Sequence, residues 1–232
     1  MTRLGIVTGL AFEAAILNQH FKSKQPGTER PDIRIAGADA ARAHLAARAM
    51  IDSGATALMS FGIAGALDPK LVPGDLVIAS GIIGPDGETV SVDSPWAARL
   101  TRLVESQCRV ISADLAGSGG GVATTAEKDE MFRATGAIAV DMESFAVGQA
   151  ARDGGATFCA VRAIADPAQR EIPSWAAGAI SSTGKTRPMA VLTGMFSRSG
   201  QIGNLARLAR DSQAAKASLG RVALLGAPGF GL

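Results

Sequence analysis

The alternation of short apolar segments with longer helix-like segments is the sequence feature that most constrains how this chain folds. Leu4–Thr8, Ala57–Phe61 and Thr157–Ile164 have the length and composition of buried strands. A helix-like stretch, Ala11–Phe21, follows the first of them. Strands that alternate with helices are typical of α/β proteins, in which helices cover a sheet. The sequence therefore predicts a layered α/β fold, and we expect a single domain over residues 1–232 because we find neither a linker nor an internal repeat.

Further elements are predicted from local signals. Strands are expected over Ile33–Ala36, Asp75–Ser80 and Ile138–Val140. Helices are expected from a cap at Asp39 to about Ser53, from a cap at Ser94 to about Gln107, and over Met142–Arg152, Arg187–Phe196 and Gln201–Leu219. The strand at Ala57–Phe61 is expected to end at Gly62 and Gly65, and Gly84–Ser94 and Ala116–Thr125 are expected to be loops.

The composition disfavours several classes of function. The chain has 232 residues, of which 47% are hydrophobic, and its formal net charge is +2, whereas nucleic-acid binders usually carry a clustered basic face. Cys108 and Cys159 show no CxxC spacing, which disfavours a disulfide framework and a zinc site. His20 and His44 are the only histidines, which disfavours a Ser-His-Asp triad. We find no apolar stretch of the roughly 18–20 residues that span a bilayer, and we expect a soluble, cytoplasmic protein.

Glu13 lies in the first turn of the helix that follows Leu4–Thr8. In open α/β sheets, ligands bind at the carboxyl ends of strands, where such a helix begins. An acidic residue there also favours the positive end of the helix dipole, and for Glu13 alone this structural role is favoured. Glycines directly after a strand, such as Gly62, let backbone N–H groups approach a ligand, or form an ordinary turn. Gly5 and Gly9 do not make the GxGxxG pattern of a dinucleotide site.

Further carboxylates lie beside two other predicted strands. Asp141 and Glu143, in Ala139-Val-Asp-Met-Glu-Ser-Phe145, project to one side if strand geometry persists. A role as a helix cap explains Asp141 readily, but it does not explain both carboxylates. Asp166 ends the buried strand that also carries Arg162. Desolvation there raises the pKa of a carboxyl, as a general acid near neutral pH requires, while a structural ion pair with Arg162 is the alternative.

These segments, in this order and spacing, resemble the nucleoside phosphorylase and nucleosidase superfamily, in particular its methylthioadenosine/S-adenosylhomocysteine nucleosidase branch. The resemblance covers about residues 4–195 and is most specific at Val140-Asp-Met-Glu143 and Val161-Arg-Ala-Ile-Ala-Asp166. It implies a three-layer α/β/α fold with a central mixed sheet. A subgroup associated with hopanoid biosynthesis, thought to remove adenine from adenosylhopane, is similar at Ser60-Phe-Gly-Ile-Ala-Gly-Ala-Leu-Asp-Pro69, Thr124-Thr-Ala-Glu-Lys128, Asp141-Met-Glu-Ser144 and Ala163-Ile-Ala-Asp-Pro167.

The resemblance implies a separate role for each of three carboxylates. Asp166 matches the position that gives a proton, directly or through a hydrogen bond, to purine N7. Glu143 matches the position that binds the ribose hydroxyls, with Met142 packing under the sugar. Glu13 matches the glutamate that orients or deprotonates the attacking water. Further substrate contacts are expected from Gly62, from the backbone at Val122 and Ala123, and from Trp175, for which a core position is the alternative. No metal and no organic cofactor is implied.

Departures from the family pattern favour water as the nucleophile. Phosphorolytic relatives carry phosphate-binding arginines where this chain has residues such as Ala11 and Ser60, and a serine where it has Ile63. A phosphate-dependent purine nucleoside or methylthioadenosine phosphorylase is the alternative. In that case a hydroxyl such as that of Thr8 or Thr125, or an arginine of a partner subunit, supplies the phosphate site.

Two further departures concern the purine. Ala165 stands where the nucleosidase branch commonly has a serine before the aspartate, and Gly119-Gly-Gly121 stands where a purine-stacking aromatic is expected. The resemblance also implies at least a homodimer, with a purine nucleoside, in the hopanoid subgroup a lipid-linked one, as substrate. A peripheral membrane contact by Gln201–Leu219 is an alternative to the favoured solvated face of a packing helix. A non-catalytic nucleotide sensor is a distant alternative, disfavoured because buried acids are costly.

Overall fold

The computed structural model describes residues 2–21, 30–171 and 202–232. The strands are β1 (Leu4–Thr8), β2 (Asp32–Ile35), β3 (Ala57–Ala66), β4 (Leu76–Ile83), β5 (Thr89–Ser91), β6 (Val110–Gly117), β7 (Ala139–Asp141) and β8 (Thr157–Asp166). The helices are α1 (Ala11–His20), α2 (Ala40–Asp52), α3 (Ser94–Val104), α4 (Thr125–Thr135), α5 (Ser144–Asp153) and α8 (Ile202–Gly226). Trp175 and the helix predicted over Arg187–Phe196 lie outside the described residues.

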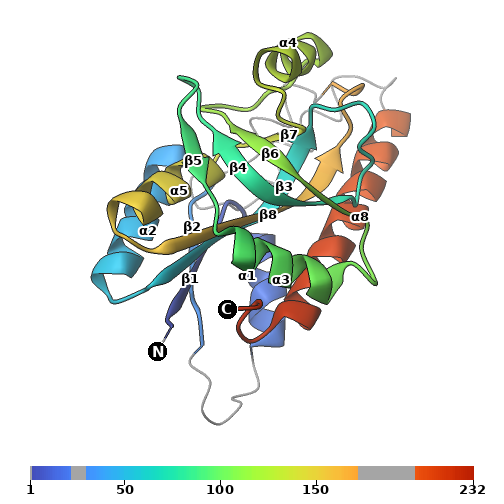
Figure 1. Cartoon of the computed structure of the whole chain (residues 1–232). Coiled ribbons are helices and arrows are strands. Elements are labelled where there is room, and N and C mark those ends of the chain that lie inside the picture. Colours follow the sequence, from blue (N-terminus) through green and yellow to red (C-terminus); the bar gives the residue numbers. More distant parts are fainter. Residues whose placement is uncertain (1, 22–29, 172–201) are drawn as a thin grey trace.

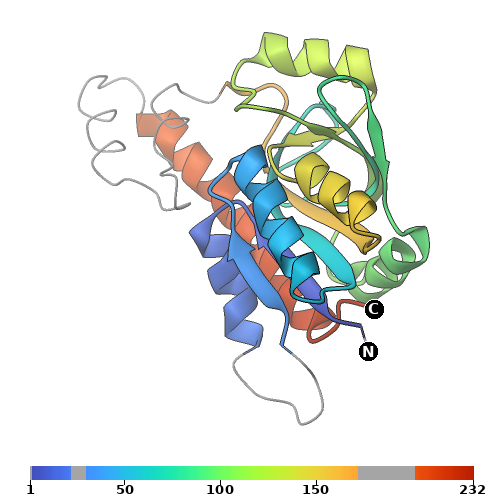
Figure 2. The same cartoon turned by 90° about the vertical axis from the view of Figure 1, so that its left-hand side faces the viewer.

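The sheet separates two groups of helices (Figure 1). α2 and α5 pack on one face, whereas α1, α3 and α8 pack on the other, so that the apolar core has a part on each side. α4 stands apart from both groups at one end of the molecule, which is plain from the side (Figure 2). The expected three-layer α/β/α fold with a central mixed sheet is confirmed.

The sheet closes on itself through β8. The strand order is β2-β1-β3-β7-β6-β4-β5, and β8 pairs with both β3 and β4. Since β8 is parallel to β3 and antiparallel to β4, the strands β3, β7, β6, β4 and β8 form a closed ring. A strand with neighbours on both edges and helices on the faces of its sheet is largely apolar, as the predicted strand Thr157–Ile164 is.

A β-bulge interrupts the pairing of β3 with β8 near its carboxyl end. Ala64 pairs with Ile164, but the next residue of β3, Gly65, pairs with Asp166. Ala165 is therefore the additional residue of the bulge, which changes the direction in which the following side chain points. β8 extends two residues beyond its predicted end and carries Asp166 as its last residue.

Sequence patterns that depend on a few neighbouring residues correctly predicted one strand and one helix cap. β1 has the predicted bounds, and the Asp39 carboxylate caps α2 by accepting a hydrogen bond from the Arg42 N–H at 2.9 Å. The prediction that Ser94 is the cap of α3 is wrong. Asp93 takes this role, accepting the Trp96 N–H at 2.7 Å, because its carboxylate reaches the first turn.

Predictions that depended on glycine or on longer loops are corrected. β3 does not end before Gly62 and Gly65 but runs through both to Ala66, because both are paired with β8 in extended conformation. The expected loop at Gly84–Ser94 contains β5, which pairs with β4. β6 and α4 were not predicted, and their ends take up part of the expected loop at Ala116–Thr125.

Helix bounds also differ from the predicted ones. α5 begins at Ser144 rather than Met142, α3 ends at Val104 rather than Gln107, and α8 continues to Gly226 rather than Leu219. None of the helices in the described part of the chain has the length and apolar character needed to cross a membrane.

Candidate functional site

The carboxyl ends of several strands surround a cavity of about 150 Å³. β1 leads through Gly9 into α1, whose first turn holds Glu13, while β7 ends at Asp141 and β8 at Asp166. Glu143 lies directly before α5. The described residues that line this cavity are Gly9, Leu10, Glu13, Ala38, Ile63, Ala64, Gly65, Gly120, Gly121, Val122, Val140, Asp141, Met142, Glu143 and Asp166. The fold thus collects carboxylates that are far apart in the sequence.

Most of the predicted site residues meet here, but two do not line the cavity. Glu13, Met142, Glu143, Asp166 and Val122 all line it. Gly62 instead lies behind the Glu13 carboxylate. Ala123 donates its N–H to Glu127 Oε2 at 3.1 Å, within the capping box of α4.

Three glycines leave the space that three carboxylates occupy. A Cβ atom added to Gly9 would lie 2.5 Å from Glu143 Oε1, and one added to Gly62 would lie 2.6 Å from Glu13 Oε1. A Cβ atom added to Gly65 would lie 3.1 Å from Asp166 Oδ2. Because ordinary contacts of a Cβ atom begin at 3.4 Å, these glycines permit the carboxylates to lie against the backbone of the strand ends.

Glu13 is held by two backbone donors. Its Oε2 accepts the Leu10 N–H at 2.7 Å, and its Oε1 accepts the Ile63 N–H at 2.9 Å. Burial raises the pKa of Glu13 to about 7, against the opposing effects of Arg162 and of these hydrogen bonds. Glu13 has the structural role considered for it, since it lies in the first turn of α1 and its carboxylate accepts the N–H of the residue before the helix. A carboxyl with a pKa near neutrality is also suited to accept a proton.

A fully buried arginine pairs with the other carboxylates beside the cavity. Arg162 on β8 pairs with Asp141, at 3.0 Å from Nε to Oδ2, and approaches Glu143 Oε2 to 3.6 Å through Nη2. The same Nη2 donates to Ser60 Oγ at 2.6 Å. Burial raises the pKa of Glu143 to about 8, opposed by Arg162 and assisted by the charges of Asp141 and Glu13. The Arg162 cation is thus shared among several carboxylates.

The N-cap residue of α5 is Glu143 rather than Asp141, but the Asp141 carboxylate satisfies the first N–H groups of the helix. Its Oδ1 accepts the N–H groups of Glu143 and Ser144, each at 2.7 Å. Burial raises its pKa, but Arg162 and the hydrogen bonds from Ser144 outweigh burial and hold the pKa below its usual value. The strand ends at Asp141, so Asp141 and Glu143 do not share strand geometry. They both face Arg162 because this capping turn brings them together.

The ion-pair partner of Asp166 is Lys128, not Arg162 as the sequence alternative proposed. Lys128 on α4 contacts its Oδ2 at 2.5 Å, so Arg162 pairs with Asp141 and not with Asp166. Burial raises the pKa of Asp166, although Lys128 and Arg170 oppose the shift. Lys128 is fully buried and was not predicted as a site residue. A lysine gives no local sign of such a contact, because Lys128 and Asp166 are 38 residues apart.

A larger cavity of about 460 Å³ adjoins the first and shares Gly120, Gly121 and Val122 with it. Its other described lining residues come from the end of β4, the end of β6 and α4, and are Ile83, Gly84, Pro85, Ala116, Gly117, Ser118, Glu127, Glu130, Met131, Ala134 and Thr135. The glycine segment that stands in place of an expected aromatic therefore separates two hollows.

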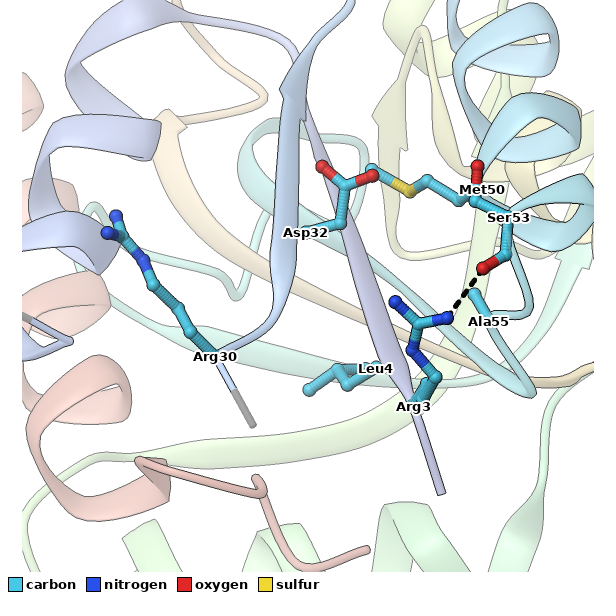
Figure 3. A pocket seen from close by; sticks show the side chains of 7 residues that line it. All are labelled: Arg3, Leu4, Arg30, Asp32, Met50, Ser53 and Ala55. Atoms are coloured by element: carbon cyan, nitrogen blue, oxygen red, sulfur yellow. Dashed lines mark hydrogen bonds between the residues drawn. The ribbon is translucent and has the colours of Figure 1, made fainter. Parts of the chain in front are cut away.

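Another cavity, of about 100 Å³, lies at the amino ends of β1 and β2 (Figure 3). Here Arg3 donates from Nη1 to the Ser53 carbonyl at 2.6 Å. Asp32, the carboxylate of this lining, pairs with Arg34 at 2.8 Å. Since ligands of such sheets bind at the carboxyl ends of strands, we assign the candidate site to the first cavity.

Solved structures with the same fold include nucleosidases. The 5'-methylthioadenosine/S-adenosylhomocysteine nucleosidase of Neisseria meningitidis, in complex with methylthio-immucillin-A, matches with a TM-score of 0.73 and 15% identity, covering 97% of this chain and 98% of that one. The S-adenosylhomocysteine nucleosidase of Streptococcus pyogenes matches with a TM-score of 0.69 and 17% identity, covering 98% of each chain. The futalosine hydrolase of Helicobacter pylori matches with a TM-score of 0.65 and 18% identity, covering 72% of this chain and 88% of that one.

Sequence comparison identifies the family. A search of curated proteins finds no match. The profile of a family described as the phosphorylase superfamily matches residues 3–196. This match spans the strand ends, the carboxylates and the closed ring of strands, and it agrees with the fold that the structural comparisons show. The chain therefore belongs to the phosphorylase superfamily.

Proposed function

We propose that this protein is an enzyme that hydrolyses the N-glycosidic bond of a purine nucleoside, with adenosylhopane as its substrate and adenine as the released base. The observation that carries the proposal is the meeting of Glu13, Glu143 and Asp166 around one cavity. Each reaches the cavity from a different element, and each fills space left by a glycine. A site that only binds a ligand has little use for several buried acids, which are costly to bury.

The proposed roles follow the charges that develop when the bond breaks. Cleavage passes through an oxocarbenium-like state, in which the sugar becomes cationic and the base gains electrons. Glu143 binds the ribose hydroxyls, and Met142 packs under the sugar. Asp166 gives a proton to purine N7, while Glu13 orients a water molecule and accepts its proton. The pKa of Glu13, about 7, suits a base at neutral pH.

Water is favoured over phosphate by the charge of the cavity. Its described lining residues include Glu13, Asp141, Glu143 and Asp166 but neither lysine nor arginine. The described lining thus offers a phosphate dianion no cationic side chain with which to pair. Thr8 was one of the hydroxyls considered for a phosphate site. It is fully buried, and its hydroxyl donates to the Arg34 carbonyl at 3.5 Å rather than to a ligand.

A large apolar 5′ group is supported by the space beside the cavity. A Cβ atom added to Gly119, Gly120 or Gly121 would meet no atom of the described residues within 4 Å. The adjoining cavity of about 460 Å³ is lined mainly by apolar side chains and glycines. The alanines of Ala176–Ala179, which were also expected to leave room, lie outside the described residues. The described surroundings of the glycine segment therefore leave room for a large 5′ group.

Base release from defined nucleosides tests the proposal. We expect release of adenine in phosphate-free buffer at a rate that added phosphate changes little, with the unphosphorylated 5-substituted ribose as the sugar product. An obligatory phosphate requirement with a ribose 1-phosphate product would establish the phosphorylase alternative instead. Tight binding of nucleosides without any base release would indicate the other alternative, a non-catalytic nucleotide sensor.

The 5′ preference needs a graded series of substrates. We expect kcat/KM to rise along 5′-alkyl adenosines of increasing length, since a remote group used in the transition state raises turnover as well as affinity. Equal turnover of methylthioadenosine and the longest analogue would exclude the lipid-nucleoside substrate while leaving the roles of the carboxylates intact.

A further inference from the structure

Lys128 is the one buried side chain of α4 among the described residues, although α4 otherwise lies apart from the body of the molecule. Its Nζ is 2.5 Å from Asp166 Oδ2, 3.1 Å from the Pro167 carbonyl and 3.0 Å from the Arg170 carbonyl. A lysine ammonium has three N–H donors, and these acceptors use all of them. Lys128 is therefore placed as a charged group with fixed orientation.

This arrangement treats the two oxygens of Asp166 differently. Oδ2 accepts from Lys128, whereas Oδ1 has no hydrogen-bond partner within the described part of the chain. The carboxyl also lines the cavity at the candidate site. One oxygen is thus anchored, and the other remains for a ligand.

We propose that Lys128 is a positioning residue for glycosidic cleavage: it anchors Asp166 through Oδ2, directs Oδ1 to the leaving purine, and stabilises the carboxylate that remains after proton transfer. The inference rests on the proposed function of this site. In the step, the O–H bond of Asp166 breaks and an N–H bond forms at purine N7. The electron pair of the glycosidic bond goes to the departing base, and Lys128 keeps all of its protons.

The charges around Asp166 determine how removal of Lys128 acts. Among the described residues, the cations that face it are Lys128 from α4 and Arg170 from the segment after β8, and Arg170 pairs with Asp211 of α8. Burial raises the pKa of Asp166, and both cations lower it. Without Lys128 the pKa rises further, so Asp166 becomes a weaker acid and its conjugate base loses its partner.

The test compares two leaving groups in Lys128→Met and in a matched control, Arg133→Met. Arg133 lies on the same helix, and its side chain is 77% exposed in a pair with Asp129. The substrates are the 5′-alkyl adenosine that the unmodified enzyme cleaves fastest and the corresponding 4-nitrophenyl riboside, whose leaving group needs no proton. For Lys128→Met we expect kcat on the adenosine to fall by about 10²-fold, within the range for general acid catalysis. KM and the turnover of the nitrophenyl riboside should change little, and Arg133→Met should resemble the unmodified enzyme on both.

The pH profile and a double variant separate positioning from folding. The alkaline limb of kcat for the adenosine should move to higher pH in Lys128→Met, because loss of acid activity follows the pKa of Asp166. In the Asp166→Asn background, Lys128→Met should cost little further activity, because Lys128 acts through Asp166. Asp166→Asn with Lys128→Met also removes both partners of the ion pair, so no buried charge is left alone.

Three results would overturn the role of Lys128: unchanged kcat with an unchanged pH profile, equal loss on both substrates, or full additivity in the double variant. If Lys128→Met does not fold, full additivity between Lys128→Arg and Asp166→Asn would overturn the role in the same way. Failure of the unmodified enzyme to release adenine would instead refute the proposed function, so the two failures are distinguishable.

Discussion

Gly62→Ala should disable the proposed base without altering any acidic residue. The added Cβ atom would lie 2.6 Å from Glu13 Oε1 and 2.8 Å from Cδ, whereas ordinary contacts begin at 3.4 Å. The Glu13 carboxylate must therefore retreat by about 0.8 Å, the difference between the 2.6 and 3.4 Å contacts. It cannot retreat freely, since its oxygens accept the N–H groups of Leu10 and Ile63.

The structure sets the size of the expected effect. A misplacement of about 1 Å in a catalytic group costs about 10²-fold in rate, so we expect kcat/KM to fall by roughly that factor. A buried N–H that loses its acceptor costs about 1–3 kcal/mol, and because the Ile63 hydrogen bond is only partly buried, its loss should lower the free energy of unfolding by about 1 kcal/mol. Base release and urea denaturation measure the two quantities.

The matched control is Gly220→Ala, because a Cβ atom at Gly220 in α8 would lie more than 4 Å from every atom in the part of the chain that the structure describes. Alanine is favoured over glycine within a helix by about 1 kcal/mol, so this variant should keep its activity and gain slightly in stability. Unchanged kcat/KM in Gly62→Ala would refute the reasoning, as it would show that the Glu13 carboxylate is not confined by Gly62 or is not the base.

Further predictions concern the acids and the core. Asp166→Asn cannot donate a proton, so turnover should fall by roughly 10²–10⁴-fold with a much smaller change in binding, and near-normal turnover would mean that the base is protonated from elsewhere. Since Glu13 must be ionised to act as a base and its pKa is about 7, kcat/KM should decline as the pH falls below about 7, and a flat profile down to pH 5 would contradict this role. Burial raises the pKa of Glu143 from 4.5 to about 8, so its contribution to stability is full below pH 4.5 and is lost as the pH rises through 8. The free energy of unfolding of Glu143→Gln, measured by denaturation from pH 5 to 9, should therefore depend less on pH than that of the unmodified protein. Trp96→Phe leaves the buried Phe230 carbonyl without the indole N–H that now lies at 2.7 Å, so it should lower stability by about 1–3 kcal/mol in thermal unfolding, and an unchanged Tm would refute this.

Local chemistry explains what could be predicted from the sequence. The apolar run of β1 and the Asp39 cap each depend on a few neighbouring residues, and both were predicted correctly. The acids of the site were found through motif resemblance. Their geometry depends on contacts between distant segments, such as Gly62 behind Glu13 and Lys128 against Asp166.

The corrected elements share a physical reason. Glycine often ends a strand, but Gly62 and Gly65 continue β3 because β8 pairs with them and carboxylates need the space beside them. α4 has a mainly polar sequence and buries Lys128, so apolar periodicity gives no sign of it. Trp175 lies outside the described residues, and its predicted contact stays a prediction.

The bulge at Ala165 places the two charged side chains of β8, Arg162 and Asp166, in separate ion pairs. In a regular strand, residues 162 and 166 would point to the same face, because side chains alternate with a period of two. The inserted residue instead sets Asp166 opposite Gly65, so Arg162 pairs with Asp141 while Lys128 pairs with Asp166. With the proposed roles, substitutions on α4 are therefore expected to change the acid strength of Asp166 without altering ribose binding. Deletion of Ala165 is expected to keep the aspartate opposite Gly65, because a spacing of three residues from Arg162 also places it on the other face of the strand.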